Sequence, residues 1–255
     1  MSSSDQIPFS SNDDNFAYHN KLHFNSEAKN MESDPFNLMV AKKCGEAIIN
    51  EIKSELDPDK TEVMDFACGT GLISQALCPY VKSIMGVDSA QAMVDEFNKK
   101  IWQQGIDESE MKAICLDLKE SEGDQLDGRK FDFVVVGISI LQCASAYHHI
   151  SDIAAITRIL ASYLKPSGKL IVLDITKDPE LVDKFKYFQD KHKHVEHTVA
   201  HKGGFYHNEI EEVFLNTRVL EDVKVEIAFT FNKFLEKDQK EYTFKYLIAK
   251  GRKKE

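Results

Sequence analysis

Five short strand-like segments alternate with amphipathic helical segments along this chain, and that alternation constrains the fold more than any other feature. Residues 131–136 form a nearly continuous apolar run, which is typical of a strand buried on both faces. Because strands and helices alternate with short connections, the pattern predicts a doubly wound α/β sheet whose strands are mostly parallel. The predicted strands are residues 62–68, 81–87, 112–116, 131–136 and 169–175.

Helical segments separate these strands, and a hairpin follows them. Ser33-Asp34-Pro35 joins a capping side chain to a proline in the first turn, and it predicts a helix that ends near Asp57-Pro58. Segments at about 222–231 and 242–249 predict an antiparallel hairpin. The expected fold is a Rossmann-like, doubly wound sheet of seven strands, mostly parallel, with an antiparallel last strand. Further helices are predicted over 72–77, 90–101, 153–164 and 208–216.

The composition limits the classes of partner. The formal net charge is −10 and the pI is about 5.4, so nucleic acid and an anionic membrane surface are not expected partners. Five cysteines, none in a C-x-x-C spacing, indicate reduced thiols in a reducing compartment. The sequence has no long apolar span and no secretory or transit signal at its start. We therefore expect a soluble cytoplasmic protein, with the nucleus also allowed, that is a monomer or a homodimer.

Acidic residues stand where the predicted strands end. The ligand of an open α/β sheet sits at the carboxyl ends of its strands, and Asp65, Asp88 and Asp117 fall at those ends. After Asp65 comes Ala67-Cys68-Gly69-Thr70-Gly71, whose glycines allow positive φ angles and a close approach of ligand to backbone. The helix start behind this turn offers free N–H groups to an anion. Taken singly, each signal also fits an ordinary turn or a solvated acid.

The acid in the glycine turn favours a cationic ligand over a dinucleotide. A pyrophosphate on this turn would lie close to Asp65, and Ser74 stands where the dinucleotide fingerprint has its third glycine. S-adenosylmethionine carries a sulfonium and an ammonium that suit the acid, and a carboxylate that suits the turn amides. Asp88 can accept both ribose hydroxyls, and Asp117 with Leu118 can hold the adenine. The P-loop pattern is missing from the sequence.

These motifs resemble those of the class I S-adenosylmethionine-dependent methyltransferases. Residues 63–71 resemble the first motif of that family, and residues 164–170 resemble the turn before its fifth strand, with Ser167 in place of a glycine. The likeness runs from Asp65 to Asp174 and is greatest to the small-molecule, ubiquinone-biosynthesis-like and generic fungal branch. It implies that the donor is bound by Asp65, Ala67, Cys68, Gly69, Thr70, Gly71, Asp88, Ser89, Met93, Asp117 and Leu118.

The resemblance also implies how the rest of the chain is organised. Residues 1–15 are rich in polar residues and are expected to be disordered, and residues 16–255 are expected to form one methyltransferase domain. Within it, residues of about 16–56 would form a helical lid that carries aromatic side chains. Residues of about 177–220 would form an insertion beside the acceptor pocket. The expected acceptor contacts are Tyr18, His201 and Phe205.

Histidines are the candidate groups for proton transfer. His148 and His149 follow the fourth strand, where a general base could stand, although one could instead cap the next helix and the other pack in the core. Residues 137–143 are longer than the family pattern, which leaves open which side chain faces the donor. A second group of histidines lacks acidic or cysteine partners in a metal-ligand pattern, so no metal is predicted; its members are His192, His194, His197, His201 and His207.

The predicted function is transfer of a methyl group from S-adenosylmethionine to oxygen, sulfur, nitrogen or carbon of a small molecule. The sequence lacks an Asn-Pro-Pro-Tyr-type motif after its fourth strand, which in the family marks base or amide nitrogens as acceptors. Three alternatives stay open at this point. They are a protein methyltransferase, a non-catalytic module that binds S-adenosylmethionine, and a nicotinamide-dependent oxidoreductase.

Overall fold

A seven-stranded sheet forms the centre of the molecule, with the strand order β3-β2-β1-β4-β7-β9-β8. The computed structural model describes residues 12–119, 124–140, 144–145, 147–179, 195–235 and 239–255. Pairs between β3, β2, β1, β4 and β7 are parallel, whereas β9 is antiparallel to both β7 and β8. The strands are β1 Glu62–Phe66, β2 Ser83–Asp88, β3 Met111–Cys115, β4 Phe131–Val136, β7 Leu164–Ile175, β8 Leu220–Leu235 and β9 Lys240–Lys253.

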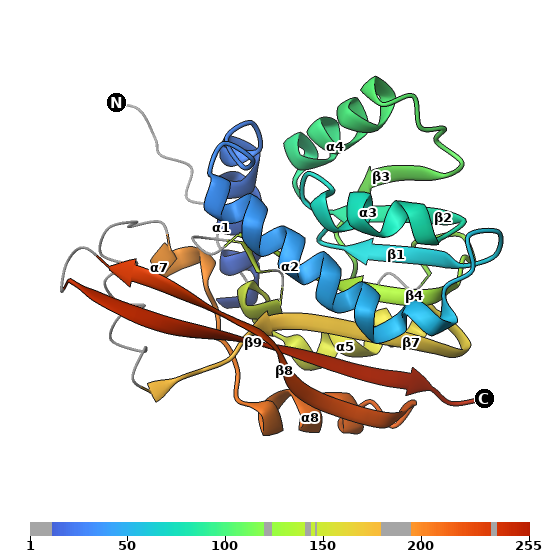
Figure 1. Ribbon diagram of the computed structural model, residues 1–255. Coiled ribbons are helices and arrows are strands. Elements are labelled where there is room, and N and C mark those ends of the chain that lie inside the picture. Colours follow the sequence, from blue (N-terminus) through green and yellow to red (C-terminus); the bar gives the residue numbers. More distant parts are fainter. Residues whose placement is uncertain (1–11, 120–123, 141–143, 146, 180–194, 236–238) are drawn as a thin grey trace, which may run out of the picture.

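Helices cover both faces of this sheet, as the alternating pattern predicts. One hydrophobic core joins one face to α2 (Pro35–Ile52), α3 (Leu72–Leu77) and α4 (Gln91–Gln103). A second core joins the opposite face to α5 (Ile153–Ser162) and α8 (His207–Asn216). In Figure 1, α2 crosses the near side of the sheet, and the far end of the β8–β9 hairpin extends past the other strands. The doubly wound, mostly parallel fold predicted from the sequence is therefore confirmed.

Local sequence explains where the main helices begin. The Asp34 side chain accepts a hydrogen bond from the Phe36 amide, and Pro35 occupies the first turn of α2, as predicted. The Asp152 side chain caps α5 in the same way by accepting from the Ala155 amide. Helix α2 ends at Ile52, earlier than the sequence suggested, and a short 3-10 turn, η1 (Lys53–Glu55), continues the chain.

The fifth strand in the predicted order begins earlier than expected. Leu164 already pairs with Phe131, and after a shift of register Lys169 pairs with Phe133. The turn that was expected to precede the strand therefore lies within β7 as an irregularity. Ser167 has a φ of 62°, in the left-handed region that favours glycine, which agrees with its place at a glycine position of the family motif.

Shorter elements surround the carboxyl ends of the strands. Helix α1 (Asn12–Glu27) lies mostly within the helical lid expected over about 16–56, and its first turn falls inside the segment expected to be disordered. A small hairpin, β5 (Ile138–Ile140) with β6 (Ala144–Ser145), leads into the 3-10 turn η4 (Tyr147–His149). A single helical turn, α7 (Val195–Thr198), packs against α1. The remaining 3-10 turn is η2 (Cys78–Tyr80).

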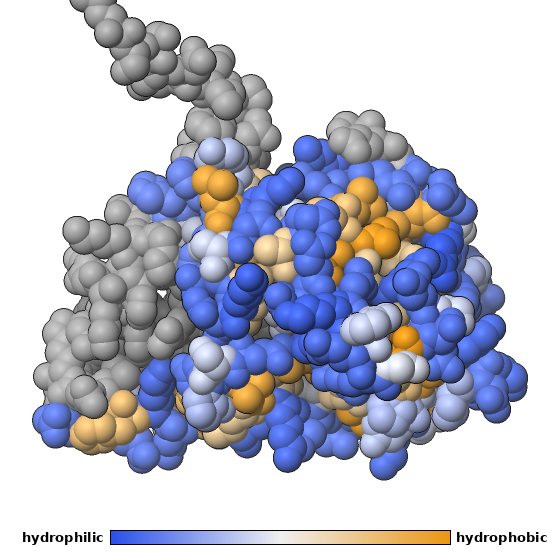
Figure 2. Space-filling model, turned by 90° about the horizontal axis from the view of Figure 1, so that it is seen from above, coloured by the Kyte–Doolittle hydropathy of each residue, from blue (hydrophilic) through white to orange (hydrophobic). Residues whose placement is uncertain are grey.

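Large apolar side chains are exposed on several separate elements. Trp102 on α4 is 80% exposed, and Phe234 on β8 and Leu215 on α8 are also exposed. Figure 2 shows, on the face seen from above, hydrophobic areas separated by hydrophilic side chains. Among the described helices, none combines the length and the apolar character that crossing a membrane requires.

Candidate active site

A cavity of about 200 Å³ lies at the carboxyl ends of β1, β2 and β3. Helix α1 covers it, since Ala17, Asn20 and Phe24 are among its lining residues. An open groove runs outward from the same place and shares Asp117 and Leu118 with the cavity. The other cavity-lining residues are Met31, Phe66, Ala67, Gly69, Asp88, Ser89, Met93, Leu116, His149, Ile150, Ser151 and Ile156.

The glycine turn after β1 has the backbone that its sequence predicts. Ala67, Gly69 and Gly71 all have positive φ angles, of 54°, 52° and 86°. Gly71 is the N-cap of α3, and a Cβ atom there would lie 2.5 Å from the ring of Phe97. Only a residue without a side chain fits between this turn and the buried ring of Phe97. The turn therefore brings backbone to the floor of the cavity.

The carboxylate of Asp88 connects the end of β2 to this turn. Its two oxygens accept hydrogen bonds of 2.9 Å, one from the amide of Gly69 and one from the amide of Ala90. Burial raises the pKa of this carboxyl, while the backbone hydrogen bonds from Ala90 and Gly69 act in the opposite direction. Asp88 therefore fixes the shape of the glycine turn and also lines the cavity.

Asp65 lies beneath the cavity instead of on its wall. It is 1% exposed, and its carboxylate accepts a 2.6 Å hydrogen bond from the hydroxyl of Ser74. Burial is the main cause that raises the pKa of Asp65 to about 7, and the nearby charge of Asp88 adds to it. Cys68, Thr70 and Gly71 are likewise not among the residues that line the cavity.

Asp65 should make the stability of the ligand-free protein depend on pH. Its pKa is higher in the folded state than in the unfolded chain, so between pH 4 and pH 7 the folded state holds the extra proton. The free energy of unfolding should therefore fall as the pH rises through this window. Asp65→Asn, which keeps a neutral oxygen for Ser74, should lack this contribution. Urea unfolding of both proteins at several pH values measures the difference, and parallel curves would contradict the expectation.

The outer end of the cavity is partly exposed. Asp117 follows β3 and forms a 3.2 Å ion pair with Lys119, with about half of each side chain exposed. Leu118 is 6% exposed and faces the cavity. Met93, on the first turn of α4, is buried and lies on the same wall. Tyr18 on α1 lines the open groove and not the cavity.

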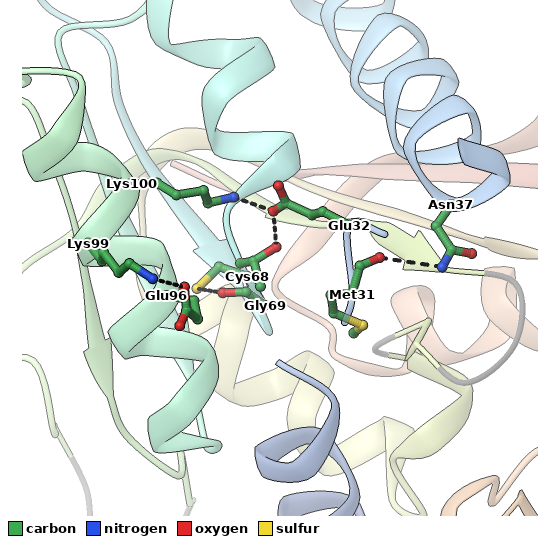
Figure 3. A network of polar contacts seen from close by, with 9 residues as sticks. Met31, Glu32, Asn37, Cys68, Gly69, Glu96, Lys99 and Lys100 are labelled. Carbon is green, nitrogen blue, oxygen red and sulfur yellow. Dashed lines mark hydrogen bonds and ion pairs between the residues drawn. The ribbon is translucent and has the colours of Figure 1, made fainter. Parts of the chain in front are cut away.

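The segment between α1 and α2 is attached to the glycine turn by a polar network that the sequence analysis did not identify (Figure 3). The carboxylate of Glu32 accepts a 2.6 Å hydrogen bond from the hydroxyl of Thr70 and also pairs with the ammonium group of Lys100 on α4. Met31, next to Glu32, lines the cavity. A separate hydrogen bond joins helix α1 to α4, because the Asn25 side chain accepts from the Ala92 amide.

The rings of His148 and His149 stack with centroids 4.7 Å apart, and His148 is not among the residues that line the cavity. His149 lines the cavity, and its Nδ1 contacts the carbonyl oxygen of Thr198 and the side-chain oxygen of Asn20. His148 Nδ1 lies 2.8 Å from the carboxylate of Asp174, a residue that the sequence analysis did not single out. Asp174 stands near the carboxyl end of β7, where the rule used for the other strands would have found it.

The remaining predicted contacts lie behind the histidine pair. The His201 amide donates a 2.9 Å hydrogen bond to the carbonyl oxygen of His148, and its ring packs on Phe205. Phe205 is 2% exposed, contacts Tyr147 and forms a bridge with Thr176. Neither His201 nor Phe205 lines the cavity or the open groove.

The histidine-rich segment is described only in part. His192 and His194 lie outside the described residues, and α7 ends at Thr198, so His201 follows that helix. His197 contacts His19 of α1, with ring centroids 5.3 Å apart. Among the residues that the structure describes, no three histidine, cysteine or acidic side chains are grouped closely enough to hold a metal ion.

Comparison with known proteins agrees with the fold and with the glycine turn. Residues 63–168 match the family model of the methyltransferase domain. Over these residues the chain is thus similar to methyltransferases. The match includes the glycine turn, Asp88 and Asp117, and it ends in the turn within β7.

Curated proteins similar to this chain match part of it. An uncharacterized methyltransferase of Schizosaccharomyces pombe is 40% identical over 156 residues, which are 60% of this chain and 51% of that protein. A ubiquinone biosynthesis O-methyltransferase of Xanthomonas axonopodis is 24% identical over 50% of this chain and 48% of that protein. The chain thus spans about half the length of the curated relatives it matches.

Solved structures share the fold over a larger part of the chain. The YcgJ protein of Bacillus subtilis superposes with a TM-score of 0.60 at 17% identity, covering 82% of this chain and 99% of that chain. The 1,6-didemethyltoxoflavin-N1-methyltransferase of Burkholderia thailandensis, whose structure contains S-adenosylhomocysteine, gives 0.60 at 14% identity, covering 98% and 93%. At these identities the likeness shows the fold alone.

Proposed function

We propose that this protein transfers a methyl group from S-adenosylmethionine to a small-molecule acceptor. The observation that carries the proposal is the roofed cavity at the carboxyl ends of β1, β2 and β3, with the Asp88 carboxylate and the glycine turn in its wall. Ligands of open α/β sheets bind at this end of the strands. The methyltransferase domain match over residues 63–168 supports the same activity.

The residues around the cavity fit this donor better than a dinucleotide. Two buried carboxylates, Asp65 and Asp88, lie close enough for the charge of one to raise the pKa of the other. A dianionic pyrophosphate beside them would be repelled, whereas a sulfonium and an ammonium would be attracted. Apolar contacts for an adenine ring are offered by Leu118 and Met93.

Each part of the wall has a distinct task in the proposed reaction. Asp88 would hold the ribose hydroxyls, Asp117 and Leu118 the adenine, and the Gly69–Gly71 turn the amino-acid end. When bound, S-adenosylmethionine supplies an electrophilic methyl group on a sulfonium. The chain has to align the acceptor with that methyl group and keep water out. Ala17, Asn20 and Phe24 of α1, which line the cavity, would limit the access of water to a bound donor.

The net charge of the chain and the names of similar proteins favour a small-molecule acceptor. The net charge of −10 disfavours a nucleic acid, which would be repelled. Similar proteins include a ubiquinone biosynthesis O-methyltransferase, and similar structures include a 1,6-didemethyltoxoflavin-N1-methyltransferase. Tyr18, which lines the open groove, is the proposed contact of the acceptor; His201 and Phe205, expected as further contacts, line neither the cavity nor the groove.

Calorimetry with S-adenosylmethionine and S-adenosylhomocysteine tests the donor half of this proposal. We expect saturable binding of both ligands and no binding of NADH or NADPH. Binding of neither adenosyl compound would refute the proposal. If both bind, a panel of metabolites and a cell extract treated with tritiated donor separate a small-molecule enzyme from a protein methyltransferase, because the second would label protein bands.

A further inference from the structure

The carboxylate of Glu32 joins three parts of the molecule at the wall of the cavity. Glu32 stands in the connection between α1 and α2, and we call residues 28–33 of this connection the strap. One oxygen of its carboxylate accepts a 2.6 Å hydrogen bond from the hydroxyl of Thr70 in the glycine turn, and the same oxygen pairs with the ammonium group of Lys100 on α4. Figure 3 shows the side chains of Glu32 and Lys100 pointing toward one another from the strap and from α4.

The strap forms part of the cavity wall. Met31, the residue before Glu32, lines the cavity and is 7% exposed. The cavity has a volume of about 200 Å³. Pockets that enclose drug-sized ligands measure roughly 300–1,000 Å³, so part of the wall has to move when a ligand of that size enters or leaves.

The strap has little apolar support, which makes it a part of the wall that can move. Its two ends are fixed, because Asn25 accepts from the Ala92 amide before the strap and Asp34 caps α2 directly after it. Segments with few buried apolar contacts open at a lower free energy than the core of a protein does. The buried side chains of the strap belong to a small cluster that is separate from the two cores on the sheet, and its buried members are Ala28, Met31, Ala90 and Met93.

The contacts of Glu32 are of a kind that can break and form again. Hydrogen bonds and ion pairs of a charged group are stronger than those between neutral groups, so they can hold a segment that has few apolar contacts. The Glu32 side chain is 33% exposed and the Lys100 side chain is 19% exposed. Water can therefore hydrate both charges when they separate, and no unpaired charge is left buried. Asp65, which is 1% exposed, has no such access to water.

We propose that Glu32 is a latch that holds the strap against the glycine turn, and that breaking its contacts with Thr70 and Lys100 limits the release of S-adenosylhomocysteine. This inference rests on the proposed methyl transfer and adds a positioning residue to it. With the latch closed, Met31 stays in the wall of the cavity and covers the bound ligand. With the latch open, the strap moves away from the turn and the ligand leaves. Glu32 thus acts through the strap and not by contact with the ligand.

The first test measures the opening of the strap in the ligand-free protein by amide hydrogen exchange. The amides of Asn30 and Ser33 donate to carbonyl oxygens three residues earlier, so they report on the strap. After correction for intrinsic rates, their exchange should be about tenfold faster in Glu32→Ala, because a partly exposed charged contact is lost. Glu96→Ala is the matched control, because Glu96 pairs at 2.9 Å with Lys99 within α4 (Figure 3). It should leave both rates unchanged.

The second test measures the dissociation rate of S-adenosylhomocysteine by stopped flow. Glu32→Ala should raise this rate about tenfold, and Glu96→Ala should leave it unchanged. Raising the salt concentration from about 0.1 M to about 1 M should speed release from the wild-type protein, because salt screens the partly exposed ion pair. Glu32→Gln keeps an oxygen for Thr70 but offers no charge to Lys100, so its release should not depend on salt in this way.

Four results would overturn the latch. They are an unchanged dissociation rate in Glu32→Ala, faster dissociation without faster exchange in the strap, equal effects of Glu96→Ala, and the same salt dependence in Glu32→Gln as in the wild-type protein. A protein that binds neither adenosyl compound would refute the proposed function instead, and hydrogen exchange without ligand would still decide whether Glu32 holds the strap. If Glu32→Ala fails to fold, Glu32→Gln takes its place in both tests.

Discussion

Replacing Asp88 with alanine is expected to weaken the binding of S-adenosylmethionine by about 3 kcal/mol, or more than 100-fold, because charge-assisted hydrogen bonds are lost. The loss has two sources. The proposed bonds to the ribose hydroxyls disappear, and the amide of Gly69 loses the acceptor that holds the glycine turn in shape. Isothermal titration with S-adenosylhomocysteine measures the affinity change.

Asp117→Ala is the matched control for this experiment. Asp117 follows strand β3 and lines the cavity, but about half of its side chain is exposed and it pairs with Lys119. Solvent replaces an exposed hydrogen bond at little cost, so this variant should lose less than about 1 kcal/mol of binding free energy. Equal effects of the two substitutions, or an unchanged affinity in Asp88→Ala, would show that Asp88 does not hold the ribose.

Gly71→Ala is expected to lower the free energy of unfolding by about 3 kcal/mol and to abolish donor binding. Part of the cost, about 1 kcal/mol, comes from a side chain at a φ of 86°. The larger part comes from the new Cβ, which would lie 2.5 Å from the fully buried ring of Phe97 and would force the turn or the ring to move. Urea unfolding monitored by circular dichroism gives the stability change.

Gly105→Ala separates the two causes. Gly105 also has a positive φ, 70°, but no atom lies within 4 Å of the position where its Cβ would stand. The Gly105→Ala substitution should therefore lower the free energy of unfolding by about 1 kcal/mol, from backbone strain alone, and leave donor binding intact. If both glycine variants lose the same free energy of unfolding, contact with Phe97 is not what excludes a side chain at position 71.

Much of the sheet could be predicted from local sequence because its periodicity is strong. The apolar run 131–136 is strand β4 with the same bounds, and the spacing of Met93, Phe97 and Ile101 is the buried face of α4. The position of β9 between β7 and β8 could not be predicted. Pairing between strands far apart in sequence depends on tertiary packing, and the alternating pattern of a single strand does not encode its neighbour.

Helix α1 shows a second limit of local sequence. Its sequence is mostly polar, so it carries little helical periodicity, and its order comes from contacts such as that of Asn25 with the Ala92 amide. The partners of the histidines were missed for a related reason. Asp174 lies 26 residues after His148, and Asn20 lies 129 residues before His149, so no short motif joins them. The glycine turn and Asp88, by contrast, are close in sequence and carry a recognisable motif.

The position of β9 also sets the order in which the molecule can be assembled. Strands β8 and β9 are joined by a short connection and can pair within about 1–10 μs, the time scale of hairpins. The parallel pairs must first close longer crossovers, and β7 gains its outer neighbour only when the finished hairpin docks on it. When the hairpin docks, the amide of Thr176 can donate a hydrogen bond to the carbonyl oxygen of Lys245. Thr176 lies two residues after Asp174. An intermediate that has completed β1, β2 and β4 would thus hold the glycine turn but not the support of His148. Pulsed hydrogen exchange should then find the amides of β1 protected before that of Thr176.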